Sequence, residues 1–190
     1  MTGRARAGRE PADAEAILAT IYSSPLVDIV RRQNVDSLNL DAEVLTKLLG
    51  GVGFGPPGSI AKGARAIQRW ARRHGADVVT HDGSGLSYTD RVSTNGIVRL
   101  LSAADGEPWG RALRSTLPAA GEGTLGGRLL GVSLRAKTGT LLQRVSALSG
   151  WVWLRQRRRW AEFSILSSGL AKPRAVALED AIVSIVSRQV

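Results

Sequence analysis

Three short motifs in the sequence carry side chains that could do chemistry together. Ser59 stands three residues before Lys62, a spacing at which a helix places the hydroxyl and the amine on the same face. A lysine placed in this way can remove the proton of a serine nucleophile. The other two motifs combine hydroxyl, amide and amine groups, and they are Ser37-Leu38-Asn39 and Lys137-Thr138-Gly139. Which of them can act together depends on the elements that carry them.

The composition is that of one globular domain. The chain has 190 residues, of which 43% are hydrophobic and 22% charged, enough to bury a core. It contains no long uninterrupted apolar run, so we expect no transmembrane segment. Because it has no cysteine, it can form no disulfide and has no thiol for catalysis or metal binding. No metal-ligand spacing appears, and we expect neither a metal nor a cofactor.

The net charge of +10 has two interpretations. A strongly basic protein can bind nucleic acid, or its surface can suit an anionic environment such as a cell wall. The Lys and Arg residues are dispersed along the chain, apart from the basic run at 155–159. We therefore expect no nucleic-acid partner, and a basic nucleic-acid-binding protein is the least favoured alternative.

The first residues differ in character from the rest. Residues 1–14 include basic and acidic side chains but no apolar segment of the kind found in a signal peptide. We predict a disordered leader over 1–14 and a single folded region over 15–190, without internal repeats.

Hydrophobic periodicity predicts mainly helices in the N-terminal part of the chain, then strands, and a last helix at the C-terminus. Helical spacing and capping residues predict helices over 23–34, 38–51, 59–75, 93–103 and 108–117, and a last one from about Pro173. We expect the second helix to end near Gly50. One face of this helix is apolar and should carry Leu40, Val44, Leu45, Leu48 and Leu49. The last helix should carry its apolar stripe on Val176, Ile182, Val183 and Val186. Strands are predicted over 77–81, 132–139, 145–154 and 159–168, the last two joined as a hairpin by the basic turn.

Four segments, in this order, resemble a known family. They are "SLNLDAEVLTKLLG", "DGSGLS" with the following "RVS", "GTLGGRL", and "AKTGTL" with the following "VSALSGWV". Ser-x-Asn followed by Lys-Thr-Gly are the second and third signatures of penicillin-binding proteins and serine beta-lactamases. The span from about Leu18 to Ser187 resembles the C-terminal part of a D-alanyl-D-alanine carboxypeptidase/endopeptidase of the penicillin-binding protein 4 type. The resemblance implies an α/β (α+β) transpeptidase-like fold, with an antiparallel sheet flanked by helices.

The resemblance also implies roles for six residues. Ser37 would help pass a proton to the leaving amine, Asn39 would orient the substrate amide, and Lys137 would tune Ser37 and attract the substrate carboxylate. Thr138 and Thr140 would hydrogen-bond that carboxylate, and Gly139 would let the peptide lie against the strand. The backbone N–H of Thr140 would be half of an oxyanion hole.

The partner implied by the resemblance is a peptidoglycan stem peptide that ends in D-Ala-D-Ala. Beta-lactams would bind the complete enzyme, which would act by a serine acyl-enzyme and work outside the cytoplasm, in the periplasm or cell wall. In this family, however, the Ser-x-x-Lys precedes the Ser-x-Asn, whereas Ser59 follows Ser37. Ser59 is better placed to cap its helix, and Lys62 shares a solvated face with arginines, whereas a general-base lysine needs to be partly desolvated.

The chain therefore lacks the expected nucleophile, and we expect either a piece of a longer gene or a degenerate relative that is inactive alone. Only the last three strands of the fold would be present, which would leave an unpaired edge on the strand 159–168 and lower the stability. The alternative function is a non-catalytic remnant that binds peptidoglycan or a partner chain.

Each motif also has a purely structural interpretation. Ser37 could be the N-cap of the helix that follows it, and Lys137-Thr138-Gly139 could be the end of a strand. A Ser-His-Asp hydrolase is a further class to consider, because His81 adjoins Asp82 and lies near Ser84. Residues adjacent on one tight turn cannot form a relayed triad, so we do not expect one.

Overall fold

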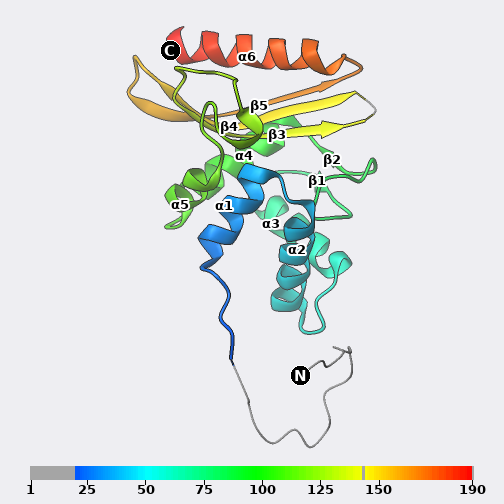
Figure 1. The fold of residues 1–190 in the computed structure, drawn as a ribbon. Helices are drawn as coiled ribbons and strands as arrows, with labels where there is room; N and C mark the ends of the chain where they lie inside the picture. The colour runs from blue at the N-terminus through cyan, green and yellow to red at the C-terminus, as the bar shows by residue number, and fades with distance from the viewer. Residues whose placement is uncertain (1–19, 143, 190) are drawn as a thin grey trace, which may run out of the picture.

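The computed structural model of the chain describes residues 20–142 and 144–189. A three-stranded antiparallel sheet lies between a C-terminal helix, α6, on one face and a group of helices, α1 to α5, on the other side (Figure 1). The predicted leader over 1–14 lies outside the described residues. The elements are α1 (Leu26–Asp36), α2 (Asn39–Phe54), α3 (Ile60–Arg73), β1 (Val78–Val79), β2 (Arg91–Val92), α4 (Thr94–Asp105), α5 (Gly110–Thr116), the short 3-10 helix η1 (Gly123–Leu125), β3 (Leu134–Leu141), β4 (Val145–Leu154), β5 (Arg159–Ser168) and α6 (Lys172–Gln189).

The sheet has the order β3-β4-β5, and both pairings are antiparallel. The predicted hairpin is confirmed, since β4 ends at Leu154 and β5 begins at Arg159. β4 is the central strand; one face is buried from Ser146 to Leu154, and the other face is half-buried except at the buried Trp151. In the described part of the chain β5 pairs only with β4, so the prediction of an unpaired outer edge on β5 is also confirmed.

The main hydrophobic core lies between the sheet and α6. Leu134, Ala136, Leu148 and Val152 point to the same face and pack with Val183 of α6. The buried side of α6 follows a spacing of four residues, Ala175, Glu179 and Val183. Ile182 was expected in the apolar stripe, but it is 38% exposed, so that part of the prediction is wrong. The carboxyl group of Glu179 lies on this buried side of α6 instead.

α2 differs from the prediction at its end and on its face. The helix continues through Gly50 to Phe54 because Gly50 is a contact point with α3 rather than a stop. A Cβ on Gly50 would lie 2.7 Å from the backbone N of Gly63, so only glycine permits this helix crossing. Thr46, buried at 3% exposure, also lies in this crossing. The predicted apolar face is exposed instead, with exposed fractions of 73% for Leu40, 47% for Val44, 59% for Leu48 and 49% for Leu49.

None of the helices in the described ranges is both long and apolar enough to span a membrane.

Candidate active site

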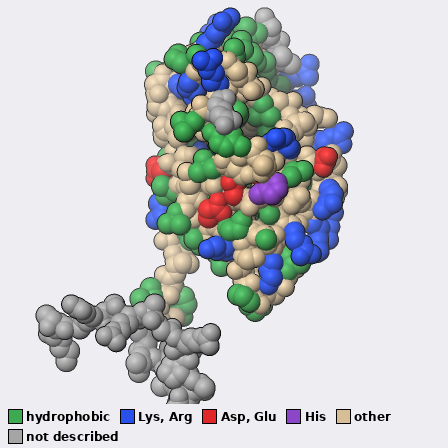
Figure 2. Space-filling view, turned by 90° about the vertical axis from the view of Figure 1, so that its right-hand side faces the viewer, with side chains coloured by type: hydrophobic (Ala, Val, Ile, Leu, Met, Phe, Trp, Pro, Cys, Tyr) green, Lys and Arg blue, Asp and Glu red, His purple; other side chains and the backbone are tan. Residues whose placement is uncertain are grey.

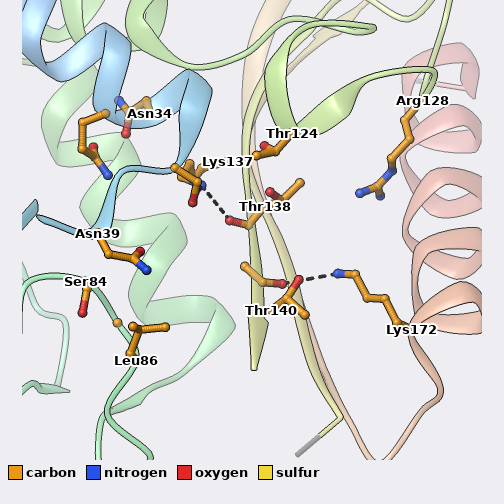
Figure 3. A pocket seen from close by; sticks show the side chains of 14 residues that line it. Asn34, Asn39, Ser84, Leu86, Thr124, Arg128, Lys137, Thr138, Thr140 and Lys172 are labelled. Atoms are coloured by element: carbon orange, nitrogen blue, oxygen red, sulfur yellow. Dashed lines mark hydrogen bonds between the residues drawn. The ribbon is translucent and has the colours of Figure 1, made fainter. Parts of the chain in front are cut away.

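A cleft of about 660 Å³ opens where the α1–α2 turn faces the free edge of β3. Figure 3 shows Asn34, Asn39 and Ser84 on one side of β3 and Arg128 and Lys172 on the other. All six residues that the sequence predicted for the site line this cleft, namely Ser37, Asn39, Lys137, Thr138, Gly139 and Thr140. Two motifs that are far apart in the sequence therefore form one concave surface.

The contact between Ser37 and Lys137 joins the two motifs directly. The ammonium group of Lys137 donates a hydrogen bond to the Ser37 Oγ at 2.8 Å and another to the carbonyl oxygen of Thr138 at 3.1 Å. Ser37 does not cap α2: the residue at the N-cap is Leu38, with no capping side chain. The structural interpretation of Ser37 as an N-cap is wrong, because its hydroxyl is turned toward β3.

Ser37 has an unusual backbone conformation. It follows α1 with φ 56° and ψ 51°, in the left-handed region that costs an L-residue roughly 1–2 kcal/mol. Its N–H donates to the carbonyl of Gln33 and so ends α1. Glycine would adopt this conformation without strain, so a serine here is consistent with a need for the hydroxyl.

The pKa of Lys137 is lowered because burial disfavours its charged form. No carboxylate within salt-bridge distance compensates it among the described residues. A lysine with a lowered pKa gives up and takes back a proton more readily at neutral pH than a solvated one. The Ser37–Lys137 pair is thus suited to move a proton between a hydroxyl and an amine.

The free edge of β3 presents backbone groups to the cleft. The N–H of Ala136 points away from β4 and donates to the Pro118 carbonyl at 3.0 Å. Since the direction alternates along an antiparallel strand, the N–H and C=O groups of Thr138 and Thr140 also point outward. An extended peptide could pair with this edge, and the Thr140 N–H is directed as an oxyanion donor would be.

Hydrogen bonds from α1 to α5 hold the turn at Ser37 in place. Arg31 of α1 donates to the Ser115 carbonyl at 2.6 Å, and the Asn34 amide donates to the Thr116 Oγ1 at 2.8 Å. Thr116 is buried, so this anchor is protected from water. The α1–α2 turn is therefore fixed to α5, in part through Asn34, which also lines the cleft.

The loop after β1 is fixed to α2 by one carboxylate. Glu43 accepts hydrogen bonds at 3.1 Å from the backbone N–H groups of Gly83 and Ser84. Burial alone would raise the pKa of Glu43, but the hydrogen bonds from Ser84 and Gly83 outweigh it and hold that pKa below its usual range. A Cβ on Gly83 would lie 2.1 Å from the Thr46 Oγ1, so the loop approaches α2 too closely for any other residue. "DGSGLS" is thus a tightly held turn that lines the cleft.

Sequence reasoning missed the cations on the far side of β3. Arg128 and Lys172 both line the cleft. Arg128 bonds to Glu179 and Asp180, each at 2.8 Å, and Lys172 donates to the Ser146 Oγ at 2.8 Å. A signal existed in the sequence: Glu179 interrupts the apolar spacing of the last helix, and a buried carboxylate needs partners.

Ser59 and His81 lie outside the cleft. The Ser59 Oγ accepts from the Lys62 N–H at 3.2 Å, so Ser59 caps α3 as predicted. The Lys62 ammonium is held by the carbonyls of Gly55 and Pro57 rather than by solvent alone, which corrects the expectation of a solvated lysine. His81 contacts Asp90 and Thr89 through the same ring nitrogen, Nδ1, which is not the relay of a triad. In the described ranges no group of three or more His, Asp or Glu could hold a metal ion.

The fold is that of the penicillin-binding and beta-lactamase-like proteins. Penicillin binding protein 4 of Haemophilus influenzae superposes with a TM-score of 0.71 at 22% sequence identity, over 86% of this chain and 40% of that chain. A class A beta-lactamase of Bacteroides cellulosilyticus superposes with a TM-score of 0.64 at 16% identity, over 85% of this chain and 62% of that chain. The expectation of an α/β fold of this kind is confirmed.

The sequence comparisons narrow the class to a family. The model of the D-Ala-D-Ala carboxypeptidase 3 (S13) family matches residues 1–189. A D-alanyl-D-alanine carboxypeptidase of an Actinomadura species is 36% identical over 183 residues, which cover 90% of this chain and 33% of the relative. The chain belongs to the D-Ala-D-Ala carboxypeptidase 3 (S13) family, and it spans about a third of the length of this curated relative.

Proposed function

We propose that this chain forms the Ser-x-Asn and Lys-Thr-Gly walls of a cleft that binds peptidoglycan peptides ending in D-Ala-D-Ala. The observation that carries the proposal is the 2.8 Å hydrogen bond from Lys137 to Ser37, which brings residues 100 positions apart into one cleft. Membership of the family and the likeness to the Actinomadura carboxypeptidase support a serine-type D-Ala-D-Ala carboxypeptidase reaction for the complete site. Such a substrate lies outside the cytoplasm, in the periplasm or cell wall.

Each cleft residue has a role in that reaction. The Ser37–Lys137 pair relays the proton that the leaving amine needs, and Asn39 orients the peptide amide. Thr138 and Thr140 hydrogen-bond the substrate carboxylate, their outward backbone groups pair with the peptide backbone, and Gly139, without a side chain, lets the peptide lie against β3. The outward N–H of Thr140 supplies one oxyanion donor.

The nucleophile is the part that these cleft residues do not supply. The Ser-x-x-Lys at Ser59 caps α3 and is not among the residues that line the cleft. A Ser-x-x-Lys segment other than Ser59–Lys62 would have to complete this cleft, so these 190 residues by themselves would bind the peptide without cleaving it. Removing the nucleophile of a covalent catalyst lowers the rate far more than the 10²–10³ that one oxyanion donor contributes.

Two measurements test this proposal. Titration of the purified chain with diacetyl-L-Lys-D-Ala-D-Ala, followed by NMR, should shift the amide signals of Lys137 to Thr140, and the L-Ala-L-Ala peptide should not. Intact mass after incubation with a penicillin, with peptide mapping, should show no adduct. A stoichiometric adduct on Ser59 would overturn the assignment of the cleft, and equal binding of both peptides would overturn the substrate class.

The family relationship favours peptide binding over nucleic-acid binding. Figure 2 shows the basic side chains of one face in separate groups with hydrophobic and neutral side chains between them. A non-catalytic binding remnant remains the alternative function, favoured if the peptide binds and the addition of a Ser-x-x-Lys segment restores no turnover.

A further inference from the structure

The side of α6 that points away from the sheet is apolar. α6 packs one side against the sheet, where Val183 is in the core. The opposite side carries Leu178, Ile182 and Ile185, whose exposed fractions are 47%, 38% and 53%. Their helical spacing puts these three side chains in one continuous strip. A surface helix usually presents polar residues to water, whereas α6 is apolar on both sides.

The only charged residues on that exposed side of α6 are arginines. The exposed residues of α6 are Pro173, Arg174, Ala177, Leu178, Ala181, Ile182, Ile185 and Arg188. The two carboxylates of this helix, Glu179 and Asp180, pair with Arg128 instead. The apolar strip is therefore bounded by a cation near each end.

The basic run at 155–159, which the cleft does not use, lies beside the C-terminal end of α6. The amide of Gln156 donates to the carbonyl of Arg188 at 3.4 Å. Arg159 is opposite Leu154 in the strand register, and Leu154 belongs to the core under α6, so Arg159 points to the α6 side of the sheet. Figure 1 shows this turn, in gold, at the same end of the molecule as the last turn of α6.

The loop before β3 adds an exposed apolar side chain next to the basic turn. The guanidinium of Arg155 donates to the carbonyl of Gly131 at 3.0 Å. Leu130, the preceding residue, is 73% exposed, while Leu129 is buried in the core under α6. The loop, the turn and the end of α6 therefore meet in one surface that combines arginines with exposed leucine and isoleucine side chains.

The charges of this surface are uncompensated. Its cations are Arg155, Arg157, Arg158, Arg159, Arg174 and Arg188, all of them exposed. Within the described ranges none of them forms a salt bridge. At the height where Figure 1 places α6, Figure 2 shows basic and hydrophobic side chains next to one another.

This combination decides what can cover the surface. A second copy of this chain would bring arginines against arginines. A soluble polyanion would pair with the arginines but would leave Leu130 and the strip on α6 in water. A membrane that contains anionic phospholipids satisfies both requirements, because arginine pairs with phosphate and apolar side chains enter the boundary between headgroups and acyl chains.

We propose that the exposed side of α6, the basic β4–β5 turn and Leu130 form a docking surface for a membrane containing anionic phospholipids. The residues of the docking surface are not among those that line the cleft. Lys172, which does line the cleft, is at the other end of α6 from Arg188. The inference goes beyond the proposed function and does not depend on it.

The first test measures binding of the full chain to lipid vesicles by co-sedimentation. The wild type should bind vesicles of phosphatidylglycerol and phosphatidylcholine but not vesicles of phosphatidylcholine alone. The combined substitution Arg157→Gln, Arg158→Gln and Arg159→Gln should lower the affinity on the order of 100-fold, since each arginine near an anionic surface contributes about fivefold. The matched control, Arg72→Gln, Arg73→Gln and Arg111→Gln, removes the same charge from exposed helix positions and should lower it less than about fivefold.

The second test asks whether the apolar strip enters the membrane. Leu178→Gln combined with Ile185→Gln should lower the affinity for the anionic vesicles about tenfold and leave the melting temperature unchanged, because both side chains are exposed. Since the chain has no cysteine, Ile185→Cys provides a single site for a polarity-sensitive fluorophore. Its emission should shift to the blue when anionic vesicles are added, and that of a label at Arg111→Cys should not.

Each of the other occupants predicts a different result. Equal losses of affinity in the two triple variants would mean that net charge alone attracts the protein, and the docking surface would be wrong. An unshifted label at position 185, with polyphosphate bound as tightly as the vesicles, would assign the arginines to a soluble polyanion and also overturn it. So would a dimer that Ile185→Gln dissociates. Peptide binding in the cleft is measured separately and should be the same in all these variants, so the two proposals fail independently.

Discussion

The strained backbone at Ser37 allows a test with two substitutions at one position. Ser37 has φ 56° and ψ 51°, and its hydroxyl accepts from Lys137 at 2.8 Å. Ser37→Ala removes the hydrogen bond and keeps the strain. Ser37→Gly also removes the hydrogen bond but relieves about 1 kcal/mol of strain. This hydrogen bond contributes about 1 kcal/mol net, less than the roughly 1.5–3 kcal/mol usual for a charged partner, because the cleft is open to water.

The free energy of unfolding should therefore fall by about 1 kcal/mol in Ser37→Ala and change by less than about 0.5 kcal/mol in Ser37→Gly. For a chain of this size, 1 kcal/mol corresponds to about 2–4 °C in melting temperature. Urea unfolding followed by tryptophan fluorescence measures both variants under the same conditions. An Ala variant as stable as the Gly variant would refute the claim that Ser37 holds a strained conformation for its hydroxyl.

Three further predictions follow from the packing and charges. Lys137→Met should raise the free energy of unfolding at neutral pH, because the buried ammonium is lost. The lowered pKa of Lys137 means that the folded state releases its proton before the unfolded state does, so the stability of wild type should approach that of the variant as pH rises toward 10.5. Urea unfolding curves of both proteins at several pH values measure this difference. Gly83→Ala should cost roughly 2 kcal/mol or more, since its Cβ would meet Thr46, while Gly53→Ala, with ordinary contacts, should not destabilise in the same thermal scan. Leu166→Lys, which puts a charge on the 37% exposed Leu166 of the β5 edge, should slow aggregation in light scattering; an unchanged rate would show that this edge does not drive association.

Local rules predicted much of the fold. The strand boundaries at Leu154 and Arg159 and the cap at Ser59 follow from short-range patterns, and the structure has them. The end of α2 could not be predicted in this way. Gly50 is a typical helix stop by composition, but here it permits the close approach of α3, a contact between segments that are distant in sequence.

The exposed face of α2 shows a second limit of pattern reasoning. Helical spacing correctly grouped Leu40, Val44 and Leu48 on one side, and the structure keeps them together. Periodicity gives the side of a helix that is apolar, but it does not say which other element covers it. Among the described residues that side stays largely exposed, and the buried side carries Thr46 and Gly50 instead.

The sequence by itself determined the family, the order of the motifs and the six motif residues that line the cleft, because these depend on residue types and spacing along the chain. Only the tertiary structure decided what those residues contact. Ser37 accepts a hydrogen bond from Lys137 instead of capping α2, and Glu179 fixes Arg128 directly and Lys172 through Ser146. These contacts are hydrogen bonds across 26 to 100 positions. Such contacts are set by how helices pack around the sheet, and no local pattern carries that information.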